Sequence, residues 1–456
     1  MKNNIYNIFL DIGKTNVKLY LLKNKNIVLE LKTKQFIKKF DNNINTLNST
    51  KLIKWLKTKL NTITIKYKVN KFVCATHGSG QAFIGYKDEV IIDVADYESN
   101  FNEINESYKK IIPKFNDTLT PLLSDGLNLG KQIHYFNKYY GNLLKKTQYI
   151  LTYPQFISWQ LCNKYNSEIS YLGCHTHLWN FKKNKFSTLI KKLNVEKKIP
   201  NPVPAWKKIG IYKINNQKIN ILNGVHDSNA SYLFFKNSKL KEFTLISTGT
   251  WFIIFNQNTP LRILNPNLDM LSNIDVFNNK VPTMRFMGGR EFEILTKLLK
   301  VKKIYRIDIK KINLKEEFLI FPSFANAGPF KKNKNLITNK INQQPNKIRY
   351  LYICIYLSFV LSFCLSKMKT SNQIIIDGPI AKNNVILEIL SSLRSNQNIF
   401  KNKSIVGTAT GAINLFNIKQ KNKINLDKVK KIKNNELEIL YKKWLASIKE
   451  KSLINN

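Results

Sequence analysis

The chain has 456 residues, of which 43% are hydrophobic, and carries a formal net charge of +45. This length is sufficient for two or three domains with full hydrophobic cores. Such a charge first suggests a nucleic-acid-binding protein. The basic residues, however, are mostly lysines that lie along the whole chain among many asparagines and isoleucines. Because arginine, the residue of bidentate phosphate and guanine contacts, is scarce, this pattern indicates compositional drift and argues against nucleic-acid binding.

The cysteines and the apolar segments predict where the protein resides. The five cysteines show no Cys-x-x-Cys spacing, which is typical of a reducing cytoplasm and gives no sign of a structural metal. The N-terminus lacks a signal-like apolar region, because Asp11 and Lys14 interrupt it. The apolar stretch 351–365 is shorter than the roughly 20 residues that cross a bilayer. We therefore expect it to be a helix buried inside a domain of a cytoplasmic protein without a membrane partner.

Residues 5–22 predict two apolar strands joined by a polar turn with the sequence DIGKTN. Gly13 has no Cβ, so the backbone can approach a ligand closely, and Asp11 can hold Mg²⁺ through carboxylate oxygens. The other turn residues can donate hydrogen bonds to phosphate: Lys14, Thr15 and Asn16. The turn therefore predicts a phosphate and Mg²⁺ site, with an ordinary polar hairpin as the alternative.

Two further strands of the first half end in polar residues that suit a sugar pocket. A strand at 71–75 leads to His77 and Gly78, and a second strand leads to Asp96 and Glu98. Polar side chains at the carboxyl ends of strands commonly line binding crevices. We expect these residues to hold sugar hydroxyls, although a purely structural His77 is an equal alternative.

The next motifs are a helix at 152–161, which carries Gln155, and the pair His175 and His177. Gln155 is a further candidate for contact with the sugar. Two histidines separated by one residue can bind a metal, but no third ligand has suitable spacing. We therefore expect the two histidines to line a pocket or to pack in the interior.

The stretch 221–231, ILNGVHDSNAS, predicts a strand that turns into a helix. Asp227 stands at the start of this helix, with His226 before it. An aspartate there can cap the helix, which is the structural interpretation. In the functional interpretation, Asp227 accepts a proton from a substrate hydroxyl and His226 contacts the same substrate.

The second half repeats the hairpin design at 243–255, FTLISTGTWFIIF. Its turn contains Thr248, Gly249 and Thr250, whose hydroxyl and amide groups suit phosphate. Two such turns that face each other across a cleft would hold a polyphosphate from both sides.

Three glycine-containing turns of the second half precede helices and are candidates for binding adenosine. They contain four candidate residues: Gly288 in MGGREF, Gly378 and Asn383 in GPIAKNN, and Gly411 in the stretch 406–416. The Lys-rich tail after them carries one amphipathic helix, at 437–445, and predicts a surface segment.

The motifs occur in a fixed order: DIGKTN, THG, DYE, GLNLG, YPQ, SYLGCHTHLW, GVHDSNAS, STGTW and RFMGGREFE. This set resembles the FGGY family of carbohydrate kinases over about residues 5–416, and most closely its fuculose and rhamnulose ketose kinases. The resemblance implies an α/β chain of two similar ribonuclease H-like domains of the actin, Hsp70 and sugar-kinase type, with a nucleotide cleft between them. We place these domains at 1–238, with the sugar and first phosphate sites, and 239–456, with the nucleotide site.

The resemblance also implies the reaction. We expect ATP-dependent transfer of a phosphoryl group to a primary hydroxyl of a ketose such as L-fuculose or L-rhamnulose, with Mg²⁺ on Asp11. Asp227 matches the catalytic base of the family. The binding partners of the protein would be the sugar and ATP. The alternatives are a kinase for xylulose, ribulose or glycerol, or a non-catalytic sugar sensor of the same fold, and a homodimer is left open.

Overall fold

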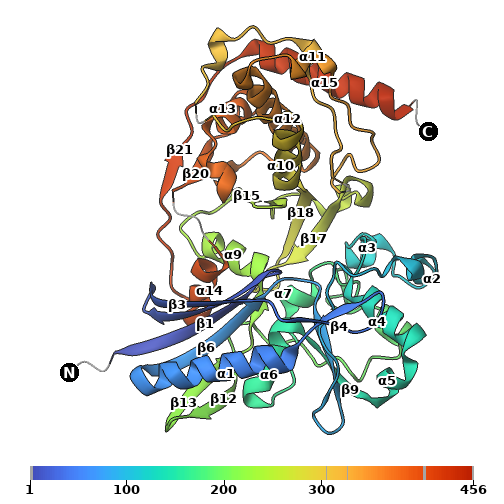
Figure 1. Cartoon of the computed structure of the whole chain (residues 1–456), viewed down its shortest axis with the longest axis vertical. Helices are drawn as coiled ribbons and strands as arrows, with labels where there is room; N and C mark the ends of the chain where they lie inside the picture. Colours follow the sequence, from blue (N-terminus) through green and yellow to red (C-terminus); the bar gives the residue numbers. More distant parts are fainter. Residues whose placement is uncertain (1–3, 305, 326, 404–406, 454–456) are drawn as a thin grey trace. The chain divides into compact units, whose positions relative to one another are not determined.

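The computed structural model describes residues 4–304, 306–325, 327–403 and 407–453 of the chain. It contains two compact units, each built on its own sheet (Figure 1). The first unit comprises Met1–Lys239, Ser272–Lys280 and Gly407–Asn422, and the second comprises Leu240–Leu271, Val281–Val406 and Lys423–Asn456. Our division at 238/239 therefore needs correction, because it assigns 272–280 and 407–422 to the wrong unit. Val406, the first residue of the predicted stretch 406–416, lies outside the described residues.

The main sheet of the first unit has the order β12-β13-β6-β1-β2-β3, and β14 also pairs with β6. Its strands are β1 (Ile5–Ile12), β2 (Asn16–Lys23), β3 (Asn26–Lys34), β6 (Lys68–Thr76), β12 (Lys208–Ile214), β13 (Gln217–Leu222) and β14 (Val225–His226). The smaller strands are β4 (Ile37–Lys39), β5 (Asn45–Leu47), β7 (Gln81–Gly85), β8 (Val90–Ile92), β9 (Thr147–Thr152), β10 (Trp179–Asn180) and β11 (Lys185–Phe186).

Helices of the first unit lie on both faces of this sheet and around the smaller strands (Figure 1). They are α1 (Ser49–Lys66), α2 (Asn105–Lys109), α3 (Phe115–Thr118), α4 (Leu129–Tyr139), α5 (Gly141–Lys146), α6 (Tyr153–Cys162), α7 (Ile169–Leu172), α8 (Leu189–Lys192), α9 (Asp227–Lys236) and α14 (Thr408–Phe416). One core lies under α9 and α14, where Leu233 and Leu415 pack with Phe9 and Val73 of the sheet. This packing is the reason that α14 belongs to the first unit although it is late in the sequence.

The second unit is built on the sheet β17-β18-β16-β15-β19-β20-β21. Its strands are β15 (Phe243–Thr248), β16 (Phe252–Phe255), β17 (Met270–Ile274), β18 (Lys280–Phe286), β19 (Gln373–Asp377), β20 (Ile399–Asn402) and β21 (Leu426–Lys428). Its helices are α10 (Gly288–Leu298), α11 (Asn339–Asn342), α12 (Asn346–Lys367), α13 (Asn384–Leu393) and α15 (Asn435–Leu453).

The two sheets share one design. In the first unit, β1 runs antiparallel to β2 and parallel to β6; in the second, β15 runs antiparallel to β16 and parallel to β19. Both predicted hairpins are therefore present, each beside a parallel strand that follows much later in the chain. The predicted α/β chain with two similar domains is confirmed.

The predicted buried helix is α12. By length and composition it is the one helix of the described chain that could cross a membrane, but 83% of its apolar window is buried inside the structure. It packs with α10 and α13 of its own unit. The prediction of a core helix is confirmed.

The C-terminal helix α15 corrects our interpretation of the tail as a surface segment. Trp444 is fully buried, and its indole nitrogen donates a hydrogen bond to the carbonyl of Ile320 at 2.8 Å. Its ring contacts Phe330 and Phe359. The lysines of the tail obscured this buried face, because only one side of an amphipathic helix needs to be apolar.

We predict that Trp444→Ala lowers the free energy of unfolding by about 3–5 kcal/mol, because it removes a large buried side chain and leaves a cavity. Ile439 lies on the same helix and is 54% exposed, so Ile439→Ala is the matched control and should change stability by less than about 0.5 kcal/mol. Denaturant unfolding measures both. Equal effects of the two variants would show that α15 does not contribute to the core.

Candidate functional site

Strand pairing brings three of the predicted motifs to one edge of the first unit's sheet. β1 and β14 both run parallel to β6, and both Ile12 and His226 stand opposite Thr76. The residues after these strand ends therefore lie at the same edge. The sequence DIGKTN, the His77 loop and Asp227 meet there because the carboxyl ends of parallel strands coincide.

The DIGKTN turn is closed by its own backbone. The amide of Gly13 donates to the carbonyl of Asn16 at 3.0 Å, and the amide of His77 donates to the carbonyl of Ile12 at 2.9 Å. The first bond fixes the shape of the turn, and the second attaches the His77 loop to it. Thr15 and Asn16 stay predicted phosphate ligands.

The ammonium group of Lys14 contacts the residues that we predicted for the sugar. It forms an ion pair with Asp96, lies 3.3 Å from Glu98 Oε2 and is 4.7 Å from the ring centre of Tyr97. Lys14 was predicted to bind phosphate, and its partners here are the two carboxylates. These contacts join the predicted phosphate turn to the predicted sugar residues within one unit.

Asp11 and Asp227 form an electrostatically coupled pair of carboxyl groups. Burial, followed by the charge of Asp227, raises the pKa of Asp11 from 3.8 to about 7. Burial also raises the pKa of Asp227, whereas His77 opposes that change. A buried carboxyl group whose ionisation is further disfavoured by a neighbouring carboxylate favours a cation beside it, which agrees with the predicted Mg²⁺ ligand Asp11.

Asp227 is the first residue of α9. Its Oδ1 accepts a hydrogen bond from the amide of Ser228 at 2.6 Å and lies 3.2 Å from Nε2 of His226. The side chain remains 29% exposed. A carboxylate that is fixed through one oxygen and reachable from solvent suits a general base.

His77 and Gly78 lie beside this aspartate. Burial lowers the pKa of His77, so the imidazole is mainly neutral at pH 7, and its Nδ1 contacts the carbonyl of Gly78 at 2.7 Å. The rings of Tyr97 and Tyr153 stand edge-on to it. A Cβ on Gly78 would lie 3.0 Å from Nε2 of His226, so this position has little room for a side chain.

His175 and His177, which are separated by one residue, lie in different surroundings. His177 is buried, and its ring nitrogens contact the hydroxyl of Tyr108 and the carbonyl of Thr120, both at 3.0 Å. His175 contacts the carbonyl of Leu127 at 2.9 Å and lies near Gly78. His177 therefore packs in the interior, which is one of the two expected roles, and pocket lining by His175 stays a prediction.

Gln155 requires a correction. It is 1% exposed, its oxygen accepts a hydrogen bond from the hydroxyl of Thr152, and its nitrogen donates to the carbonyl of Asn223 at 2.9 Å. Its polar atoms are thus occupied in the interior. In place of a sugar contact, it fixes the turn before β14 and hence the position of Asp227.

The second unit contains a cavity of about 250 Å³ beside the turn at 248–250. Its lining combines backbone, aromatic and cationic groups: Gly249, Thr250, Phe252, Gly289, Arg290, Phe292, Glu293, Lys303, Pro379, Ile380 and Asn383. Apolar walls with two cations suit a base and its attached phosphates. Gly249, Thr250 and Asn383 are the predicted nucleotide residues that line it.

Two glycines make this turn possible. The amides of Gly289 and Arg290 donate to the carbonyl of Thr250 at 3.2 and 3.3 Å, and a Cβ on Gly289 would clash with the carbonyl of Gly249. Gly378 has φ of +91°, and a Cβ there would clash with the carbonyl of Thr248. Gly378 therefore shapes the cavity's edge through backbone packing.

Other predicted nucleotide residues have structural tasks. The hydroxyl of Thr248 donates to the carbonyl of Asp377 at 2.6 Å, and the side chain of Asn383 caps α13 and donates to the hydroxyl of Tyr350. A Cβ on Gly288 would clash with Phe252, so Gly288 serves packing and its neighbour Gly289 lines the cavity. Gly411 lies in the first unit, where it allows α14 to approach Ala230 closely.

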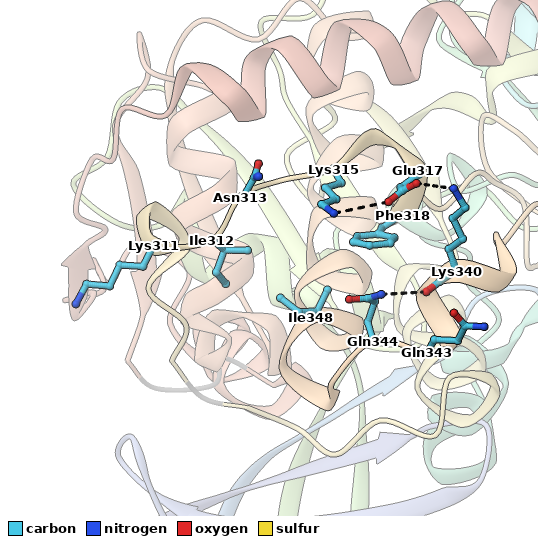
Figure 2. A pocket seen from close by; sticks show the side chains of 10 residues that line it. All are labelled: Lys311, Ile312, Asn313, Lys315, Glu317, Phe318, Lys340, Gln343, Gln344 and Ile348. Carbon is cyan, nitrogen blue, oxygen red and sulfur yellow. Dashed lines mark hydrogen bonds and ion pairs between the residues drawn. The ribbon is translucent and has the colours of Figure 1, made fainter.

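A larger cavity of about 540 Å³ lies elsewhere in the second unit (Figure 2). Its lysines already have a carboxylate partner, because Lys315 and Lys340 lie 4.0 and 2.7 Å from Glu317. None of the predicted site residues lines this cavity in the described part of the chain. The smaller cavity is therefore the candidate nucleotide site.

Sequence reasoning missed several residues of both sites. Gly289, Arg290 and Lys303 line the cavity, and Tyr97 lies beside Lys14 and His77. The Gly-Gly-Arg triplet before a helix, in a chain with few arginines, was the available signal for two of them. Lys303 has no local signal, because it reaches the cavity only through the fold.

We predict that Gly289→Ala destabilises the protein by about 1–3 kcal/mol, because the new Cβ forces backbone to move. Gly249→Ala is the control for stability, since a Cβ there meets nothing within 4 Å. Thermal unfolding of both variants tests the difference. Equal stabilities would mean that the two turns do not approach each other closely.

We also predict that Asp11→Asn stabilises the metal-free protein at pH 8 by roughly 1–3 kcal/mol. The raised pKa means that folded Asp11 holds its proton between about pH 4 and 7 where unfolded Asp11 has lost it, so the wild type loses stability as pH rises through this window. The advantage of the variant should shrink as the pH is lowered from 8 to 5. The free energy of unfolding of both proteins is measured without Mg²⁺ from pH 8 to pH 5. A stability difference that does not change with pH would contradict the raised pKa of Asp11.

Comparison with known proteins gives a family similarity for residues 240–424 and the fold of the whole chain. Residues 240–424 match the family model of the carbohydrate kinase FGGY C-terminal domain. None of the curated proteins matches the chain by sequence. A solved carbohydrate kinase from Novosphingobium aromaticivorans is 24% identical with a TM-score of 0.84, covering 97% of this chain and 98% of its own.

Two other solved structures share the fold at lower identity. A xylulose kinase from Lactobacillus acidophilus has a TM-score of 0.77 at 14% identity and covers 98% of this chain and 97% of its own. A glycerol kinase from Plasmodium falciparum has a TM-score of 0.76 at 11% identity and covers 98% of both chains. Residues 240–424 are therefore similar to the C-terminal domain of the FGGY carbohydrate kinases, and the chain as a whole shares the fold of the solved carbohydrate kinases.

Proposed function

We propose that the protein transfers the γ-phosphoryl group of ATP to a primary hydroxyl of a ketose. The observation that carries this proposal is Asp227, a carboxylate fixed at the start of α9 with one oxygen engaged and its side chain partly exposed. It lies in electrostatic contact with Asp11 and His77 at the edge where the parallel strands end. The FGGY match of residues 240–424 supports a sugar or polyol as the acceptor.

Mg²⁺ fits beside Asp11. The carboxylate of Asp11 provides hard oxygen ligands, and the neighbouring charge of Asp227 adds negative potential. When bound, the ion would neutralise charge on the phosphate oxygens. Asp11 is the residue that we propose as its ligand.

The chain's own residues orient the acceptor. Asp96 and Glu98 can accept hydrogen bonds from sugar hydroxyls, and Lys14 holds both carboxylates in place. His77, mainly neutral at pH 7 because burial lowers its pKa, adds an uncharged polar group beside Gly78. This arrangement supplies positioning, which accounts for most of the catalysis in phosphoryl transfer.

Asp227 takes the proton of the acceptor hydroxyl as the new oxygen–phosphorus bond forms. The transition state of phosphoryl transfer is loose, so the base acts late and mainly orients the nucleophile. Its raised pKa favours this task, because a base with a pKa nearer to neutrality accepts the proton more readily.

The cavity of the second unit is the proposed nucleotide site. Phe252, Phe292 and Pro379 give apolar surface for the base, and Arg290 and Lys303 give cations for phosphates. Gly249 and Thr250 line the same cavity, in agreement with their predicted phosphate role.

The acceptor that we propose is a ketose of the L-fuculose or L-rhamnulose type, because the order of motifs from DIGKTN to RFMGGREFE is closest to that group. Two of the structures with the same fold are named as xylulose and glycerol kinases. Xylulose, ribulose and glycerol are therefore the alternative acceptors, and a non-catalytic sugar sensor is the alternative function.

We predict that Asp227→Asn lowers kcat by about 10²- to 10⁴-fold and leaves ATP affinity within a factor of about two. ADP release is measured with ATP against L-fuculose, L-rhamnulose, both enantiomers of xylulose and ribulose, and glycerol. Asp88→Asn is the control, because the side chain of Asp88 accepts hydrogen bonds from Asn163 and Tyr165 in an exposed loop. If Asp227→Asn phosphorylates a sugar at nearly the wild-type rate, the assignment of Asp227 as the base is rejected. ATP binding without turnover on any acceptor would favour the sensor.

A further inference from the structure

His226 is positioned for a different task from the predicted sugar contact. It is the last residue of β14, lies directly before Asp227 and is only 5% exposed. The ring of Tyr171 stands edge-on to it, and the thiol of Cys174 lies 3.9 Å from its Nε2. A side chain enclosed in this way has little surface left for a substrate.

The hydrogen bonds of Asn229 determine which nitrogen of His226 carries the proton. The amide nitrogen of Asn229 donates to the carbonyl of Ser170 at 3.1 Å, which fixes the orientation of the amide group because a carbonyl only accepts. The same nitrogen lies 3.4 Å from Nδ1 of His226. Nδ1 must then be the acceptor, so the proton of the neutral imidazole is on Nε2.

This assignment places a protonated ring nitrogen close to the base. Nε2 lies 3.2 Å from Oδ1 of Asp227, which also receives the amide of Ser228 at 2.6 Å and its hydroxyl at 3.3 Å. In the described part of the chain, no residue donates a hydrogen bond to Oδ2 of Asp227. The two oxygens of the carboxylate are therefore in different environments.

We propose that His226 is a positioning residue, which holds Oδ1 of Asp227 through its Nε2–H and leaves Oδ2 as the oxygen that takes the substrate proton. This inference rests on the proposed kinase function. In the step, the acceptor oxygen bonds to the γ-phosphorus, the bond from that phosphorus to the bridging oxygen of ADP breaks, and the hydroxyl proton passes to Oδ2. His226 keeps its own proton throughout.

The chain Ser170–Asn229–His226–Asp227 explains why these residue types occur together. An aspartate at position 229 would accept a hydrogen bond from Nδ1 and reverse the tautomer, whereas asparagine sets it. Gly78 packs against Nε2 from the other side, at 3.0 Å from where a Cβ would stand. The imidazole is thus held by its neighbours before any substrate binds, as a preorganised site requires.

The first test reads the tautomer directly. The chain has five histidines, so protein labelled with ¹⁵N-histidine gives few ring signals, and His226→Gln identifies the one of interest. We expect a neutral ring protonated at Nε2 at pH 7, in the protein without substrate. A ring protonated at Nδ1 overturns the proposal, whatever reaction the protein catalyses.

The second test is a double-mutant cycle, in which kcat and KM are measured with the sugar that the wild type phosphorylates. We expect His226→Leu to lower kcat about 10- to 100-fold with KM values for sugar and ATP within about threefold. His226→Gln, whose amide nitrogen reaches about as far as Nε2, should recover most of kcat, and His226→Asn should not. In the Asp227→Asn background, His226→Leu should cost less than about threefold, because its effect passes through Asp227.

The control is His134→Leu, since His134 contacts Ser107 and lies outside the site. Equal losses from His226→Leu in both backgrounds, or a raised sugar KM with normal kcat, would overturn the positioning role and restore a direct sugar contact. If His226→Leu does not fold, the proposal is tested by the kinetic comparison of His226→Gln with His226→Asn and by the tautomer of His226 in the wild type. If the wild type turns over none of the acceptors, the kinase function is rejected, and the positioning role of His226 in that reaction is rejected with it.

Discussion

The parallel pairing of β6 with both β1 and β14 is the constraint on which the site of the first unit depends. Parallel strands end at a common edge, so the turn after β1, the loop after β6 and the start of α9 meet there although they are far apart in the sequence. Asp11, His77 and Asp227 are together for this reason. Each hydrogen bond that fixes this edge, such as that of His77 to Ile12, therefore also fixes the chemistry.

The edge concentrates groups that are unfavourable for stability and useful for a reaction. Burial raises the pKa of both Asp11 and Asp227, the charge of Asp227 raises that of Asp11 further, and burial lowers the pKa of both His77 and His226. The neutral imidazoles can then act as directional hydrogen-bonding groups beside Asp227. Such strain between neighbouring titratable groups is typical of active sites and has little use in a purely structural core.

In the second unit, the turn at 248–250 is held in shape by close contacts between backbone segments, whereas the site of the first unit is held mainly by side chains. Gly289 and Gly378 have no room for a Cβ, and they bring the turns around Thr248 and Thr250 against neighbouring backbone. The turn therefore needs few side-chain contacts to keep its form. The cavity beside it combines this closely packed backbone with the cationic side chains of Arg290 and Lys303.

The sequence by itself determined the two hairpins, the buried helix α12 and the residue types of the base and the phosphate turns. Apolar periodicity and glycine are local signals, and they are legible without a fold. Only the tertiary structure decided which polar groups are occupied. Gln155 and Thr248 looked available in the sequence, but their hydrogen bonds are used by turns 68 and 129 residues away along the chain. The return of α14 to the first unit and the burial of Trp444 likewise depend on contacts between distant segments, which one-dimensional patterns do not contain.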